Sequence, residues 1–428
     1  MRIRHATIAL VAFVSVAMLA GCTKGDARWG NPGSVPTTTP PAKLIFSYDD
    51  GATDVSPGEP VTVQVQNGTL QTVSLSSNVG EVQGLISQDG EIWSSMQDLE
   101  FGKTYTLAVS SLGEDGKAVE ETRTFSTVDV KVGFYWNVYF NTSSNYYGVP
   151  LDGGTFGVGQ PIVARFDDSV DKKVAEQTLS VETVPAVQGS WYWVNDREAH
   201  WRPQAYWAPG TKVTVTSKGL GVVMNTGDGR ELHGQENKTA SFTIGDSKVA
   251  KVDNNTHMMT VYINGQVAHD PIPVSMGRDN PYRDMDGTLH DFRTTSGVMV
   301  VTEKHDPVLM KPDLPCPSYP DLKKDCDPNF YETKVNLAVR ITDSGIYVHS
   351  APWTTPGPGE HWGQGYDNES HGCVNISEAN AQWFYATFNP GDVVEVANTG
   401  VNVGVTDGLG DWNLPWDQWL AGSALAAR

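Results

Sequence analysis

Short runs of alternating apolar and polar residues recur along the chain from about residue 44. Val61–Val65 and Tyr105–Val109 are typical, and Gly-containing turns separate one run from the next. Because successive side chains of a β-strand point to opposite faces, this period of two predicts strands with one buried face. Short strands at such spacing are typical of β-sandwiches. The chain is therefore predicted to be mainly β.

An internal repeat divides the first part of this region into two modules. The segment Gly58–Val63 recurs as Gly159–Ala164, and Trp93, nine residues before a glycine, recurs as Trp201 in the same relation to another glycine. Repetition of this kind indicates two copies of one supersecondary unit. We therefore expect two β-sandwich modules, over residues 43–128 and 129–247.

Aromatic residues are concentrated in the second module. An exposed cluster would suit carbohydrate stacking, whereas a buried cluster would form the sandwich core. Trp191 and Trp193 fall on one face of a strand, and large aromatics dominate core burial, so we favour the core. The cluster comprises Trp191, Tyr192, Trp193, Trp201, Tyr206 and Trp207.

A third region, residues 248–398, opens with a hairpin pattern. Two short apolar runs flank Asn264-Gly265, a pair that supplies the positive φ angles of a two-residue turn. Only residues 377–387 have the pattern of a helix, with Ser377 as its N-cap. Further strands are expected at residues 298–301, 336–341 and 345–348. Residues 399–428 form a tail in which Trp412, Trp416 and Trp419 are expected to dock onto neighbouring domains.

The N-terminus has the pattern of an export signal. Two arginines precede an apolar run from Ile8 to Leu19, which is too short to span a bilayer comfortably. The run ends in Leu19-Ala20-Gly21-Cys22, which resembles the bacterial lipobox, so residues 1–21 are expected to be removed and Cys22 to be lipidated. A plain signal peptide with an incidental cysteine is the alternative. Residues 22–42, rich in Pro, Gly and Thr, are expected to be a flexible tether.

The charge balance narrows the range of partners. The chain carries 50 acidic and 30 basic residues, a net charge of -20. This sign is wrong for a protein that binds nucleic acid or an anionic membrane through its surface. Nucleic acid is therefore excluded as an expected partner.

The cysteines divide into different roles. In an oxidising, exported setting, cysteines either pair or react. Cys316 and Cys326 lie ten residues apart in a segment rich in prolines and charges, where a local disulfide is the economical interpretation. Such a short loop predicts about 2–3 kcal/mol of stabilisation, enough to stiffen the segment. With Cys22 lipidated, Cys373 is left without a partner.

The residues around Cys373 favour a reactive thiol. It lies in Ser370-His371-Gly372-Cys373-Val374-Asn375, where Gly372 permits a tight turn and close approach of a substrate. Amides around Cys373 could then face a developing oxyanion. Upstream, His349 ends a predicted strand, and a neutral imidazole there can accept the thiol proton. The sequence thus predicts a Cys–His pair for acyl transfer.

The order of the two residues excludes several classes of cysteine enzyme. No histidine follows Cys373, which excludes papain-like and other cell-wall cysteine peptidases in which the base follows the nucleophile. Sortases have the order seen here but require an arginine after the cysteine. The only basic residue after Cys373 is the terminal Arg428.

This combination resembles the L,D-transpeptidase family, whose signature is a histidine at a strand end followed by S-H-G-C-x-N. The resemblance covers about residues 248–398. In the mycobacterial-type members it extends over two preceding immunoglobulin-like modules and a Trp-bearing tail. It implies that Cys373 attacks the meso-diaminopimelate carbonyl of a tetrapeptide donor stem in peptidoglycan, releasing D-Ala. An acceptor stem's diaminopimelate amine, deprotonated by His349, would then form the cross-link.

The resemblance also assigns the surrounding residues. Ser350 would orient His349 through its carbonyl, and Gly372 and Cys373 would supply oxyanion amides. Tyr331, eighteen residues before His349, matches a substrate-contacting tyrosine. The remaining expected pocket or substrate-binding residues are Met310, Ser344, Gly345, Ser370, His371 and Asn375. No cofactor or metal is implied, and the expected location is the outer face of the plasma membrane, held there by the lipid on Cys22.

The chain departs from the family pattern in three places. The family often has Thr-Pro-x-Gly where this chain has Thr294–Gly297, so that turn is expected to be less rigid. The other departures are the cysteine pair inside the expected lid and a Gly- and Pro-rich loop over residues 352–369. Both could reshape access to Cys373.

Three other functions remain open from the sequence. A zinc site could use His349, His361, His371 and Cys373, since imidazole and thiolate are good zinc ligands. The protein could instead be a non-catalytic wall-binding lipoprotein. An L,D-carboxypeptidase, which hydrolyses the same intermediate, would use the same residues.

Overall fold

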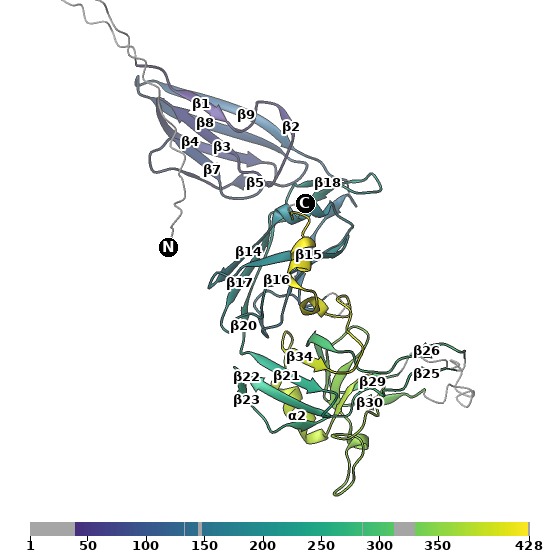
Figure 1. The fold of residues 1–428 in the computed structure, drawn as a ribbon. Helices are drawn as coiled ribbons and strands as arrows, with labels where there is room; N and C mark the ends of the chain where they lie inside the picture. Colours follow the sequence, from purple (N-terminus) through teal and green to yellow (C-terminus); the bar gives the residue numbers. More distant parts are fainter. Residues whose placement is uncertain (1–38, 132, 144–147, 285, 312–329, 427–428) are drawn as a thin grey trace, which may run out of the picture.

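The computed structural model describes residues 39–131, 133–143, 148–284, 286–311 and 330–426 (Figure 1). Three β-rich bodies follow one another along the chain, and the C-terminal segment, yellow in Figure 1, returns to the middle body. The mainly β fold expected from the alternating pattern is confirmed.

The first body is a sandwich of two sheets with strand orders β1-β3-β7-β6 and β2-β9-β8-β4-β5. In β3 the valines at 63 and 65 are buried while the intervening Gln64 is exposed, as the period of two predicted. The strands are β1 (Lys43–Phe46), β2 (Ala52–Val55), β3 (Thr62–Gln66), β4 (Gly68–Ser77), β5 (Gly80–Val82), β6 (Gly84–Ile86), β7 (Ile92–Ser95), β8 (Thr104–Gly113) and β9 (Ala118–Thr127).

The second body repeats this arrangement with sheets β11-β13-β16-β15 and β12-β20-β17-β14, and adds a small sheet β10-β19-β18. In both bodies the repeated segment forms a strand that pairs antiparallel with the strand carrying the repeated tryptophan, β3 with β7 and β13 with β16. The register differs by two residues, because Val63 pairs with Trp93 whereas its counterpart Ala164 pairs with Ala199. The strands are β10 (Tyr135–Trp136), β11 (Val138–Asn141), β12 (Thr155–Phe156), β13 (Ile162–Phe166), β14 (Leu179–Val184), β15 (Gly189–Asn195), β16 (Glu198–Pro203), β17 (Lys212–Ser217), β18 (Val223–Asn225), β19 (Glu231–Gly234) and β20 (Lys238–Ile244).

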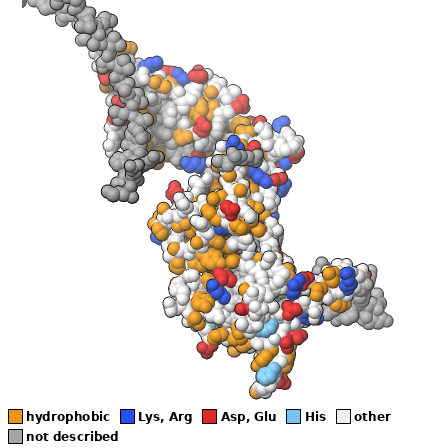
Figure 2. Space-filling model, in the orientation of Figure 1, with side chains coloured by type: hydrophobic (Ala, Val, Ile, Leu, Met, Phe, Trp, Pro, Cys, Tyr) orange, Lys and Arg blue, Asp and Glu red, His pale blue; other side chains and the backbone are white. Residues whose placement is uncertain are grey.

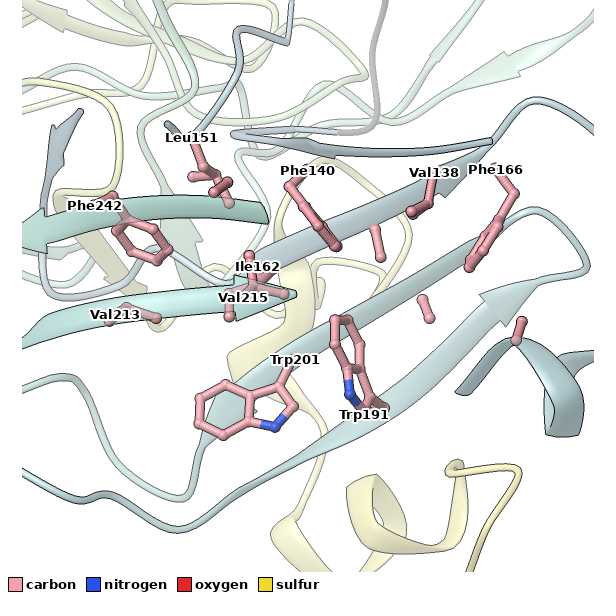
Figure 3. Close-up of a cluster of buried hydrophobic side chains, with 14 of the residues drawn as sticks. Val138, Phe140, Leu151, Ile162, Phe166, Trp191, Trp201, Val213, Val215 and Phe242 are labelled. Carbon is pink, nitrogen blue, oxygen red and sulfur yellow. The ribbon is translucent and has the colours of Figure 1, made fainter. Parts of the chain in front are cut away.

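The aromatic cluster of the second body lies in its core. Trp191, Trp193, Trp201 and Trp207 are all buried in one cluster with valines of both sheets. Figure 3 shows Trp191 and Trp201 beside Val138, Val213 and Val215. The four tryptophans therefore confirm the core interpretation, whereas Tyr192 and Tyr206 are half-buried and contact Trp419 and Trp412 of the C-terminal tail. The helix α1 (Lys172–Thr178), capped by the Asp171 side chain, was not expected from the sequence.

The third body holds the sheet β23-β22-β21-β34-β27, on which β24 pairs with β22, and the sheet β28-β31-β32-β33. Two hairpins, β25–β26 and β29–β30, extend from it. The strands are β21 (Lys248–Asp253), β22 (Met258–Ile263), β23 (Gln266–Val267), β24 (Ile272–Pro273), β25 (Tyr282–Arg283), β26 (Leu289–His290), β27 (Gly297–Val300), β28 (Glu303–His305), β29 (Val308–Met310), β30 (Thr333–Val335), β31 (Ala338–Arg340), β32 (Tyr347–Ser350), β33 (Val374–Ile376) and β34 (Val393–Ala397).

Two local predictions in this body are confirmed. Asn264 and Gly265 have φ angles of 49° and 78° and join β22 to β23. The helix α2 (Glu378–Thr387) begins after Ser377, whose side chain accepts from the Asn380 amide. The strand expected at 345–348 is shifted, because residues 342–346 form a turn and β32 begins at Tyr347.

The C-terminal tail packs against the second body. The Trp412 indole donates to the Gly159 carbonyl at 2.8 Å, and the Trp419 indole donates to Ser190 at 2.9 Å. The Arg202 guanidinium lies over the rings of Trp412, Trp416 and Trp419. The tail contains η3 (Gly410–Asn413) and α3 (Trp416–Ala421).

Some expectations fall on residues that the structure does not describe. The signal peptide, the lipidated Cys22, most of the tether and the Cys316–Cys326 disulfide all lie outside the described residues. Among the residues that are described, no helix is long and apolar enough to cross a membrane.

Candidate active site

The candidate site lies where β32 and β33 run parallel. In their register His349 pairs with Asn375, so the end of β32 lies beside the turn that carries Cys373. Hydrogen bonds between Ser275 and Asn375 join β33 to the segment before Gly277 on its other side. The parallel pairing thus brings together His349 and Cys373, which are 24 residues apart in the sequence.

A cavity of about 180 Å³ opens at this point. His349 and Cys373 both line it, as do the expected Met310, Tyr331, Ser370, His371 and Asn375. The hairpin β29–β30 and the segment that follows Ser350 form further walls. The lining residues that the sequence did not indicate are Thr333, Val335, Trp353 and Glu369.

His349 is held in one orientation and kept neutral. It is buried, and its Nδ1 lies 2.8 Å from the Ser350 carbonyl oxygen, the contact expected from the sequence. A carbonyl can only accept, so Nδ1 carries the proton and Nε2 is left as the acceptor. Burial lowers the pKa of His349 to about 4, outweighing the opposite effect of the Ser350 carbonyl. The imidazole is therefore ready to accept a proton at neutral pH.

Cys373 is a protonated thiol in this setting. It is the free cysteine among the described residues, is half-buried, and its Sγ lies 3.7 Å from the Gly345 carbonyl oxygen. Burial raises the pKa of Cys373 to about 11, although a backbone hydrogen bond from Tyr347 acts the other way. Both members of the pair are thus uncharged at rest.

The turn before Cys373 is fixed by two hydroxyl groups. Ser370 Oγ donates to the Cys373 carbonyl at 2.6 Å and accepts from the Gly372 amide at 3.0 Å. Thr294 Oγ1 donates to the Gly372 carbonyl at 2.7 Å. Gly372 has a φ of 127°, which disfavours any side chain there. The Gly372 amide donates to Ser370 Oγ here, and its expected oxyanion role stays a prediction.

His371 belongs to a cluster that the sequence did not indicate. An Arg278 amino group donates to His371 Nε2 at 2.7 Å, and the rings of Phe292 and Tyr331 lie 4.6 and 4.9 Å from the imidazole, centroid to centroid. Burial and the neighbouring guanidinium lower the pKa of His371 to about 4. With Nε2 occupied in this way, His371 shapes the wall of the pocket.

Asn375 presents an acceptor to the pocket. Its side chain is only 3% exposed, and its Oδ1 accepts no hydrogen bond from the described residues. Its backbone groups are bonded to Ser275. A buried amide oxygen without a partner is costly, which marks Asn375 as an unsatisfied polar group beside the cavity.

Ser344 and Gly345 lie on the turn that was expected to border the donor stem, and only one of them reaches the pocket. Gly345 meets the Cys373 thiol, but Ser344 does not line the cavity. Its amide and hydroxyl donate to the two carboxylate oxygens of Asp407, at 2.6 and 2.7 Å. The tail thus holds both hydrogen-bonding groups of Ser344, and its expected substrate contact stays a prediction.

Three residues of the zinc alternative, His349, His371 and Cys373, line the cavity, but His361 does not. Over the described ranges, no group of three or more His, Cys, Asp or Glu side chains is arranged to hold a metal ion. The His361 ring contacts that of Tyr366 at a tilt, and His371 accepts a hydrogen bond from Arg278. The geometry favours the Cys–His pair.

Some of the missed residues had a recognisable signal. Trp353 follows His349 by four residues and could have been placed at the pocket by its distance from the strand end. Arg278 and Thr294 had none, because they reach the site only through tertiary contacts with the turn at His371 and Gly372.

Comparison with known proteins agrees with this geometry. Residues 247–396 match the L,D-transpeptidase catalytic domain, and residues 52–223, across both sandwiches, match a bacterial Ig domain. L,D-transpeptidase 2 of Mycobacterium tuberculosis is 38% identical over 90% of this chain and 85% of its own length. L,D-transpeptidase 5 of the same species is 32% identical over 90% and 78%. A solved LD transpeptidase in complex with imipenem is 30% identical over 60% of this chain and 99% of its own, with a TM-score of 0.45. The identity of the first two relatives over nearly the whole chain shows that this protein belongs to the L,D-transpeptidase family.

Proposed function

We propose that the protein is a peptidoglycan L,D-transpeptidase that acts through a Cys373 acyl-enzyme. The observation that carries the proposal is the shared cavity, in which a protonated thiol and a neutral, oriented imidazole both face the same space. Relatives over nearly the full length bear the same activity in their names. A non-catalytic role would not require this arrangement.

The first half-reaction forms a thioester. His349 Nε2 accepts the thiol proton as Cys373 Sγ attacks the carbonyl of meso-diaminopimelate in a tetrapeptide donor stem. The C–N bond to the terminal D-Ala breaks, and the proton leaves on its amine. Asn375 Oδ1 is available to accept from a donor-stem amide during this step.

The second half-reaction forms the cross-link. The side-chain amine of an acceptor stem's diaminopimelate attacks the thioester, and His349 takes up its proton. The thiolate leaves, and the proton returns to Cys373. Water in place of the amine would give L,D-carboxypeptidase activity with the same residues.

Five further residues support the reaction but do not transfer protons: Ser350, Tyr331, Met310, Ser370 and His371. The Ser350 carbonyl sets the tautomer of His349, and the Ser370 hydroxyl holds the nucleophile turn. Met310, Tyr331 and His371 line the donor cavity. Burial, with the nearby Cys373, raises the pKa of Tyr331 to about 12, so its phenol stays a hydrogen-bond donor.

Its location follows from the substrate. Because peptidoglycan lies outside the cytoplasm, we propose that the chain is exported and held at the outer face of the plasma membrane by lipid on Cys22. The lipobox-like sequence supports this part of the proposal. Mass spectrometry of the membrane-extracted protein would reveal the lipid, and an unmodified N-terminal peptide would contradict the anchor.

The test of the function uses purified protein and tetrapeptide stems. Wild type should form a thioester adduct seen by intact-protein mass spectrometry and should convert stems into cross-linked dimers. Cys373→Ala should show neither while keeping its thermal melting curve. Dimer formation by Cys373→Ala would refute the nucleophile, and D-Ala release by wild type without dimers would identify a carboxypeptidase.

A further inference from the structure

The segment between the base and the nucleophile carries an unusual set of exposed aromatic rings. The chain has 13 tryptophans, and in the described residues only Trp353 and Trp362 are exposed, at 51% and 40%. Tyr366 in the same segment is 44% exposed. The remaining described tryptophans are buried or half-buried, in domain cores or domain contacts. Exposed apolar side chains gathered on one segment indicate an interaction surface.

These rings lie on a loop whose base is closed and fixed. The buried Gln364 side chain donates to the Ala351 carbonyl at 3.0 Å and to Thr354 Oγ1 at 3.1 Å, and its amide donates to the Thr354 carbonyl. Gly363 packs against Thr354 so closely that a Cβ there would lie 2.3 Å from its carbonyl oxygen. Trp353 directly precedes Thr354, and Trp362 directly precedes Gly363, so both indoles lie next to this closed base. The two exposed indoles therefore emerge from one point of the fold.

The orientation of Trp362 is also set by a hydrogen bond. Its indole N–H donates to Glu360 Oε2 at 2.8 Å, and the same carboxylate oxygen accepts from the Gly357 amide at 2.9 Å. The Tyr366 ring lies 5.0 Å from that of His361, centroid to centroid, with the two ring planes tilted by 55°. Rings fixed in advance lose less conformational entropy on binding than free side chains do. The loop extends from the catalytic domain in Figure 1, and hydrophobic and histidine side chains gather at that end in Figure 2.

The aromatic loop (residues 352–366) meets the catalytic cavity at Trp353. Trp353 lines the cavity together with His349 and Cys373, and its ring centroid lies 6.2 Å from that of His349. A stem peptide held at Cys373 remains attached to its glycan strand, so the polymer must pass out over the rim of the cavity. Trp353, near the start of the aromatic loop, lies at that rim.

The charges on the loop favour contact with the sugar chain of peptidoglycan over contact with its peptides. Glu360 is ionised, because hydrogen bonds from the Gly357 amide and from the Trp362 indole lower its pKa. Asp367 and Glu369 are exposed close by. These carboxylates disfavour a second peptide bearing free carboxylates and do not disfavour an uncharged sugar chain. Flat aromatic faces also suit the C–H faces of sugar rings.

Resting on the proposed function, we propose that Trp362 and Tyr366 form a stacking surface for the uncharged sugar rings of the glycan strand that carries the donor stem. This surface would make the enzyme prefer stems attached to glycan over free stem peptides. Trp353, at the border, would contact both the cavity and the strand.

The experiment compares two donors that differ only in their sugars. Donor KM and kcat are measured for a free tetrapeptide stem and for the same stem carried on short glycan strands. Trp362→Ala and Tyr366→Ala should raise KM for the glycan-borne donor about fivefold to tenfold and leave KM for the free stem within twofold. Tyr139→Ala, a tyrosine of similar exposure at 45% on β11, is the matched control and should change neither.

A binding arm separates this proposal from the proposed reaction. An oligomer of β-1,4-linked N-acetylglucosamine is titrated into the Cys373→Ala protein, with tryptophan fluorescence as the readout. Binding that Trp362→Ala weakens and Trp362→Phe retains supports stacking on the ring face. The proposal is overturned if the oligomer does not bind, if Trp362→Phe is as impaired as Trp362→Ala, or if both donors are affected equally. A wild type that binds the oligomer but forms no cross-link would instead refute the proposed reaction alone.

Discussion

The uncharged resting state of the Cys373–His349 pair predicts an unusual pH profile for the nucleophile. Burial raises the pKa of Cys373 from 9.0 to about 11, so its thiolate population at pH 7 is about a hundredfold below that of an ordinary cysteine. Burial lowers the pKa of His349 to about 4, so the imidazole does not supply a positive charge that would stabilise the thiolate. Ionisation must then accompany attack on a bound substrate.

Alkylation by iodoacetamide measures this directly. Because the reagent reacts with the thiolate, the rate at Cys373 should rise about tenfold per pH unit from pH 6 to pH 10 without a plateau. Peptide mapping assigns the label to Cys373 and separates it from the other cysteines. His349→Ala should leave the alkylation rate within about threefold, since the imidazole contributes little charge, yet it should reduce transpeptidation on the order of 10²–10⁴-fold as expected for a lost general base.

The opposite result has a clear meaning. A plateau of reactivity between pH 6 and pH 8 that disappears in His349→Ala would show a thiolate–imidazolium pair in the free enzyme. That outcome would refute the reasoning from burial, because attraction within the pair would then exceed the cost of removing both charges from water.

Three further predictions concern neighbouring parts of the molecule. His371→Ala should slow cross-linking less than His349→Ala does, and the reverse ranking would reassign the base to His371. His200→Ala should lower the free energy of unfolding by about 3–5 kcal/mol in urea titrations, because it leaves buried Asp411, whose Oδ1 lies 2.6 Å from the imidazole, without its partner. Burial opposes charging of His200, but Asp411 and a second carboxylate outweigh it and raise its pKa to about 10. This stabilisation should be complete below about pH 6.5 and decline as pH rises towards 10. Asp407→Ala should slow thioester formation about tenfold by loosening the turn at Gly345, and an unchanged rate would contradict that role.

The sequence alone was enough to predict the local structure and the chemistry. A period of two forces one face of each strand to be buried, which is why β3 and β8 were predictable. The turn at Asn264-Gly265 and the helix cap at Ser377 depend on local backbone conformation and local hydrogen bonds. Residues close in the sequence therefore determine both features. The proposed nucleophile and base could be picked out because acyl transfer needs particular residue types at a strand end and in a glycine turn.

Only the tertiary structure determined the protonation states and the surrounding contacts of Cys373 and His349. The protonation states of Cys373 and His349 follow from burial, which depends on every element packed around them. Arg278 reaches His371 from 93 positions away along the chain, and Asp407 reaches Ser344 from 63. Contacts between residues so far apart in the chain produce no periodic pattern in the sequence, because each partner could equally well lie on a solvent-exposed surface. Only the folded chain determines that the tail holds the turn beside the nucleophile.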